Sequence, residues 1–109
     1  MPINYKVLGQ SAPGATTNVD LYTVPSATEA IVSTLTVTNR ATSSTTFRVA
    51  VRPAGASISD EHYVVYDAEI AAKSVATFTI GLTLSATDVV TVYAGSSDLS
   101  FGLFGSEVS

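Results

Sequence analysis

His62 is the only histidine in the chain, and it directly follows two acidic residues, Asp60 and Glu61. It is therefore the only side chain whose unperturbed pKa lies near neutral pH. A hydrolase of the Ser-His-Asp kind needs three converging groups, and Asp60 would share a strand face with His62 if the strand extended back that far. The sequence contains no Gly-x-Ser-x-Gly motif that would place a nucleophilic serine before a helix. We therefore predict that the protein is not an enzyme.

The acidic residues around His62 form the densest charged patch of the sequence: Asp60, Glu61, Asp67 and Glu69. Their carboxylate oxygens are of the kind that bind Ca²⁺, but the Asp-x-Asp-x-Asp-Gly spacing of a calcium loop is absent. Strand alternation would also turn Glu61 away from Asp60 and His62. With no cysteine and no glycine-rich phosphate loop, the sequence predicts no cofactor. Metal binding at residues 60–62 stays open, as does a pH-sensitive contact to a neighbouring subunit.

Four tyrosines are candidates for contacts with a sugar or a protein, because tyrosine buries a large area while keeping a polar tip. They are Tyr22, Tyr63, Tyr66 and Tyr93. The commoner role of such residues is to fill the rim of a β-sandwich, so each tyrosine has two interpretations.

The elements that would position these side chains are organised around residues 30–52. Residues 31–38 and 45–52 alternate at period two in β-branched and apolar residues, and the polar run 39–44 joins them. In the first segment Ile31 and Leu35 would share one face and Val32 the other. We predict an antiparallel hairpin here, with the remaining strands packed on it.

The other strand-like segments are 3–8, 19–24, 62–66, 73–80, 89–94 and 99–103. Leu82 and Leu84 would continue the apolar side of Phe78 and Ile80, with a bulge at Gly81. About eight strands with turn signals between them predict one all-β domain over residues 1–109. Its architecture would be a single antiparallel β-sandwich, either immunoglobulin-like or a jelly roll.

Two strands are apolar on both faces, at residues 63–66 and 89–93. Such a strand is either covered twice in the centre of a sheet or lies at an edge that meets a partner. Arg48 and Arg52 are the only basic residues that share a strand face. The predicted interface residues are therefore Tyr63, Val64, Val65, Tyr66, Val90, Val92, Arg48 and Arg52.

The charge balance limits the classes of partner. The net charge of −4 and the scattered basic residues disfavour nucleic acid, which needs clustered Lys and Arg. No apolar run resembles a signal peptide or a membrane span, so we expect synthesis and folding in the cytoplasm and no membrane contact.

Charged residues make up only 13% of the chain, against about 25% in ordinary soluble domains. Their place is taken by 14 serines and 15 threonines. A neutral, threonine-rich β surface is one interpretation. The other, which we favour, is that neighbouring subunits cover much of this surface in an assembly.

Several strand-and-turn phrases resemble small structural proteins of tailed bacteriophages: residues 20–25, 30–40, 46–51, 84–95 and 104–107. The resemblance implies a non-enzymatic virion protein that is made in the host cytoplasm, either a capsid decoration (cement) protein or a tail, baseplate or fibre module. It implies phage capsid or tail proteins as partners and a symmetric homo-oligomer, with a trimer favoured. A receptor- or glycan-binding role belongs to the fibre alternative. The resemblance transfers no catalytic residue.

Overall fold

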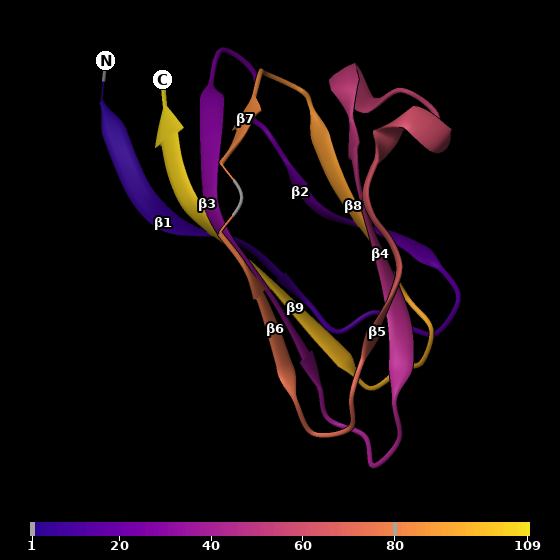
Figure 1. The fold of residues 1–109 in the computed structure, drawn as a ribbon. Coiled ribbons are helices and arrows are strands. Elements are labelled where there is room, and N and C mark those ends of the chain that lie inside the picture. Colours follow the sequence, from indigo (N-terminus) through magenta and orange to yellow (C-terminus); the bar gives the residue numbers. More distant parts are fainter. Residues whose placement is uncertain (1, 80) are drawn as a thin grey trace.

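The computed structural model describes residues 2–79 and 81–109, and strands dominate this part of the chain (Figure 1). Two short 3₁₀ turns, η1 (Pro53–Gly55) and η2 (Asp60–His62), lie between the fourth and fifth strands. The strands are β1 (Ile3–Ser11), β2 (Asn18–Thr23), β3 (Glu29–Asn39), β4 (Thr45–Arg52), β5 (Tyr63–Ile70), β6 (Val75–Phe78), β7 (Leu82–Leu84), β8 (Val89–Ala94) and β9 (Leu99–Val108).

The strands form two antiparallel sheets, which confirms the predicted β-sandwich. Sheet A has the order β1-β9-β3-β6, with β7 also paired to β3, and sheet B has the order β2-β8-β4-β5. β6 and β7 pair with successive halves of β3, so together they act as one interrupted strand. The predicted continuation of the apolar side through Ile80 lies outside the described residues.

The pairing order is that of a jelly roll. When β6 and β7 are taken as one strand, β1 pairs with β9, β2 with β8, β3 with β6–β7, and β4 with β5. The first half of the chain therefore pairs with the second half in mirrored order, as in a long antiparallel ribbon that is folded back and rolled up. An immunoglobulin sandwich distributes its strands differently between the sheets. The structure thus decides between the two topologies that the sequence left open.

The predicted hairpin at residues 30–52 is wrong in its pairing, although both strands exist. β3 belongs to sheet A and β4 to sheet B, so the chain crosses from one sheet to the other through residues 40–44. Asn39, which is 1% exposed, holds this crossing: its Nδ2 donates to the carbonyl oxygens of Ser43, Ile70 and Ala71. Its Oδ1 accepts from the amide of Ala41. A polar run of six residues is long enough for a hairpin within one sheet or for a crossing between two sheets. The packing of apolar faces between the sheets selects the crossing.

A β-bulge in β3 changes which side chains face the core. The register against β9 shifts between Val32 and Thr34, so Val32 faces inward together with Leu35. Ile31 points outward and is 47% exposed, which corrects the prediction that Ile31 and Leu35 share a face. The extra residue of a bulge interrupts period-two alternation, and simple pattern counting cannot detect it.

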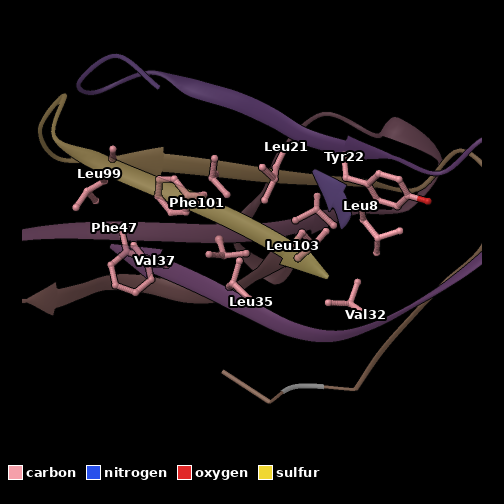
Figure 2. Packing of buried hydrophobic residues seen from close by; sticks show 14 of the residues in the cluster. Leu8, Leu21, Tyr22, Val32, Leu35, Val37, Phe47, Leu99, Phe101 and Leu103 are labelled. Carbon is pink, nitrogen blue, oxygen red and sulfur yellow. The ribbon is translucent and has the colours of Figure 1, made fainter. Parts of the chain in front are cut away.

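The core lies between the two sheets and has Phe47 of β4 near one end (Figure 2). The Phe47 ring centroid lies 6.2 Å from that of Phe101 and 6.0 Å from that of Phe78. These edge-on and tilted arrangements are favourable for aromatic pairs. The core residues labelled in Figure 2 are Leu8, Leu21, Tyr22, Val32, Leu35, Val37, Phe47, Leu99, Phe101 and Leu103.

Candidate functional site

The outer face of sheet B, which points away from sheet A, carries an arginine between two tyrosines. Arg48 and Tyr93 are directly opposite each other on β4 and β8. Both point outward because their neighbours Phe47 and Val92 are buried in the core. The Arg48 guanidinium carbon lies 4.3 Å from the ring centroid of Tyr93 and 4.4 Å from that of Tyr66. Both distances are typical of cation–π contacts, so the three side chains support one another.

Asp67 fixes Arg48 in this position. The β4–β5 register shifts at this point, and Asp67 has a φ of 50°, in the left-handed region. This irregularity brings its carboxylate to Arg48, with 2.6 Å from Nε to Oδ1 and 3.3 Å from Nη2 to Oδ2. The hydrogen bond to Asp67 raises the pKa of Arg48 above its ordinary value. The planar fork of Arg48 is therefore held by a two-point contact and stays charged.

Tyr63 and Tyr66 form an aromatic corner beside this stack. Their ring centroids are 4.9 Å apart and their planes meet at 80°. Asp60, Tyr63 and Tyr66 line an open cleft of about 490 Å³. Tyr66 is 58% exposed, so much of its ring is accessible from solvent. The sequence placed Tyr63 and Tyr66 in one predicted interface and Asp60 in a separate acidic patch, and the structure brings all three to one cleft.

Arg52 occupies a second hollow on the same face, but its donors are already used. Its Nε donates to Thr91 at 2.9 Å, its Nη2 to Asp20 at 2.8 Å and its Nη1 to the carbonyl oxygen of Ala56 at 2.9 Å. The hollow measures about 220 Å³ and is lined by Asn18, Asp20, Arg52, Ile58 and Thr91. These bonds tie the η1 turn to sheet B, and they indicate a structural role for Arg52.

Val64 and Val65 of the predicted interface lie on β5, the edge strand of sheet B. Val64 is 47% exposed. Val65 is partly buried and packs against the core. Contact of this strand with a partner stays a prediction for Tyr63, Val64 and Tyr66.

The prediction that Val90 and Val92 line an interface is wrong. Both side chains are fully buried in the core. β8 lies in the interior of sheet B between β2 and β4, so its run of apolar residues reflects coverage on both sides. This was the other interpretation of a strand that is apolar on both faces.

The acidic residues near His62 have separate roles. His62 Nδ1 accepts a hydrogen bond from the amide of Ser59 at 3.1 Å, which caps η2. A hydrogen bond from its own backbone amide, followed by one from Ser59, lowers the pKa of Glu61. Asp67 is engaged by Arg48. Within residues 2–79 and 81–109 no three histidine or acidic side chains gather closely enough to hold a metal ion.

A second exposed surface lies on the outer face of sheet A and was not predicted. Ile3, Tyr5 and Val7 of β1 point outward with exposed fractions of 53%, 84% and 49%, and Ile31 of β3 lies on the same face. We call these four residues the β1 strip. β1 is the edge strand of sheet A, so the strip borders a row of backbone groups with no neighbouring strand among the described residues.

The inward side of β1 carries a charged residue, Lys6, next to the buried core residue Leu8. Lys6 Nζ lies 3.0 Å from Glu107 Oε1, and the Tyr22 hydroxyl donates to Glu107 Oε2. Glu107 is only 9% exposed. The hydrogen bond from Tyr22, followed by that from Lys6, lowers the pKa of Glu107. Burial, followed by the bond to Glu107, raises the pKa of Tyr22.

This charged contact explains why the strip was missed. The alternation of residues 3–8 separates Ile3, Tyr5 and Val7 from Asn4, Lys6 and Leu8. The first set, with three apolar residues, is the ordinary candidate for the core. Which side of β1 faces the core depends on Glu107 of β9 and Tyr22 of β2. Both residues are distant in the sequence, so the pattern of β1 alone does not reveal their contacts. The signals in the sequence are Lys6, which alternates with apolar residues, and Leu8, which shares its side of the strand and is buried in the core. Both signals are weak.

Among the described residues, no helix is long and apolar enough to cross a membrane. In the comparisons with known proteins, no protein family, no curated protein and no solved structure matches this chain.

Proposed function

We propose that the protein is a non-enzymatic structural protein of a tailed-bacteriophage particle, made in the host cytoplasm and assembled on the virion. Its role would be that of a capsid decoration (cement) protein, which stabilises the particle through oligomeric surface contacts. The phage-like strand phrases support this proposal, and its partners would be capsid proteins and further copies of this chain. The observation that carries it is the exposed β1 strip.

The β1 strip has the properties of a surface that another chain covers. Tyr5 is 84% exposed, and Ile3, Val7 and Ile31 are each about half exposed on one face. An apolar edge strand is a template for pairing with a further strand, and soluble proteins ordinarily protect such edges. Toward residue 9 the edge is closed by β2, since a Cβ on Gly9 would lie 2.3 Å from the Leu21 carbonyl oxygen. The accessible part of the edge is therefore residues 3–7.

The magnitudes favour many weak contacts. Complete burial of one large apolar side chain is worth about 1.5–3 kcal/mol, so covering the exposed parts of the four strip residues offers roughly 3.5–7 kcal/mol per copy. Association costs an estimated 4–15 kcal/mol in lost freedom of motion. One such contact is marginal by itself, whereas a closed ring or a lattice adds several contacts per subunit. A symmetric trimer is the arrangement that we favour.

Co-sedimentation with phage particles that lack this protein tests the proposal, together with light scattering on the isolated protein. We expect the wild-type protein to oligomerise and to bind particles, and the Tyr5→Ser variant to bind about tenfold more weakly or worse. Val75→Ser is the matched control, because Val75 is 60% exposed on β6, at the other edge of sheet A. A wild-type protein that stays monomeric and does not bind particles contradicts the proposal.

A tail, baseplate or fibre module with a receptor- or glycan-binding role is the second candidate. The cleft lined by Asp60, Tyr63 and Tyr66 favours it. The aromatic rings offer contact area to a small ligand such as a glycan, and the carboxylate offers hydrogen-bond acceptors. Location of the protein in an electron-microscopy map of the particle distinguishes a head position from a tail position.

A further inference from the structure

The cleft beside Tyr66 is larger and less occupied than the other hollow on sheet B. Its volume of about 490 Å³ falls within the range of small-molecule sites. In the smaller hollow, the Arg52 guanidinium already donates hydrogen bonds to Asp20 and Thr91. In contrast, the hydrogen bonds found among residues 2–79 and 81–109 include none to the carboxylate of Asp60 or to the hydroxyl groups of Tyr63 and Tyr66. The larger cleft therefore presents polar groups that a ligand can use.

The aromatic wall of this cleft is held in place before any ligand arrives. Tyr66 stacks on Arg48, with 4.4 Å from the guanidinium carbon to the ring centroid, and Asp67 fixes Arg48 from the side. Tyr93 supports the guanidinium from β8, and Tyr63 meets Tyr66 at 80°. Side chains that are already ordered lose little conformational entropy on binding. Less of the free energy of ligand contacts is therefore spent on ordering the site.

The charges around the cleft favour a neutral ligand. A cation on Tyr66 would share the ring with the Arg48 guanidinium, which has the same charge. An anion would meet the carboxylate of Asp60, which lines the cleft. A neutral molecule avoids both costs. It must offer hydroxyl donors to Asp60 and an apolar face to the tyrosine rings.

Saccharides combine these two properties, since a sugar ring carries hydroxyl groups at its rim and C–H groups on its faces. We propose that the cleft formed by Asp60, Tyr63 and Tyr66 binds a neutral saccharide, with a ring of the sugar stacked in the tyrosine corner and its hydroxyl groups donating to Asp60. The site lies on the outer face of sheet B, and the β1 strip lies on the outer face of sheet A. The inference rests on the second candidate function, for which it names the class of ligand. It does not depend on the decoration role, because docking through one face leaves the other accessible.

Saturation-transfer NMR and chemical-shift titration with glucose, galactose, N-acetylglucosamine and lactose test the site. We expect at least one of these sugars to bind the wild-type protein with millimolar affinity or better. Tyr66→Ala and Asp60→Asn should each weaken binding about tenfold or more. Tyr66→Phe keeps the ring and should bind almost as the wild type does. Tyr5→Ala, on the other sheet, is the matched control and should leave the affinity unchanged.

Three results overturn the proposal. The first is no binding of any of these sugars at up to about 50 mM by a protein whose melting curve shows that it is folded. The second is sugar binding that Tyr66→Ala and Asp60→Asn leave unchanged while both variants remain folded. The third is binding of tetramethylammonium in place of the sugars, which would make the corner a cation site. If Tyr66→Ala abolishes particle binding and no sugar binds, the face is a protein interface, whereas failure of the Tyr5→Ser test affects only the decoration role.

Discussion

Glu107 shows how one residue sets the orientation of a whole strand. Its carboxylate lies between the sheets, where burial of a charge is costly unless partners satisfy it. Lys6 and the Tyr22 hydroxyl supply those partners from β1 and β2. Because Lys6 must point inward to reach Glu107, the alternate residues of β1 are turned outward. The exposed β1 strip is therefore a consequence of the inward contacts of Lys6 with Glu107 and of Leu8 with the core.

The pH dependence of stability should reveal this contact. The pKa of Glu107 is lowered in the folded protein, so its contribution is complete above the unfolded value of about 4.3 and is lost as the pH falls through the lower folded value. We expect Glu107→Gln to be less stable than the wild type at pH 7, and the difference to shrink between about pH 5 and pH 3. Urea unfolding at a series of pH values measures it.

Tyr22→Phe is the companion variant, because it removes the hydrogen bond with the largest effect on the pKa of Glu107. It should show an acid dependence between those of the wild type and Glu107→Gln. A difference between wild type and Glu107→Gln that is the same at every pH would contradict this role of the carboxylate.

At the scale of elements, the paired strands β3 and β9 form the middle of sheet A, and their register depends on one glycine. The bulge in β3 lies beside Gly105 of β9, which pairs with Val32. A Cβ at residue 105 would lie 2.0 Å from the carbonyl oxygen of Ile31. That contact involves backbone on both sides, so it cannot be relieved by rotating a side chain.

We expect Gly105→Ala to lower the free energy of unfolding by about 3 kcal/mol or more, because the strands must separate or shift. Gly14→Ala is the matched control, since a Cβ there meets nothing within 4 Å. Its effect should stay within about 0.5 kcal/mol. Thermal and urea unfolding of both variants measure the difference. Equal stabilities would show that the strands accommodate a side chain at residue 105 and that the register does not depend on this glycine.

The positions of the strands could be predicted from the sequence far better than the pairing of the strands in the sheets. Period-two alternation located β4 at its observed bounds, and it located the second strand, predicted at 19–24, to within one residue at each end. The pairing of β3 with β4 was predicted wrongly because neighbouring strands usually pair, while a jelly roll sends them to different sheets. The outward turn of Ile31 depends on a bulge that pattern counting does not detect.

At the scale of the whole molecule, the sandwich separates two surfaces of different chemistry. The outer face of sheet A carries the apolar β1 strip, and the outer face of sheet B carries the stack of Arg48 and its tyrosines. Individual tyrosines of the second face were candidates from the sequence. Their convergence with Asp60 was not predictable, because it depends on the register shifts between β4 and β5.

We propose that another chain covers residues 3–7 of β1, and hydrogen–deuterium exchange of the protein, alone and on phage particles, measures this coverage. Backbone amides along this edge should exchange quickly in the free protein and gain protection on particles, because a new strand or subunit takes up their hydrogen bonds. The amides of β6, at the other edge of sheet A, serve as the internal reference. If the exchange of the β1 amides is the same in the free and the particle-bound protein, no other chain covers this edge.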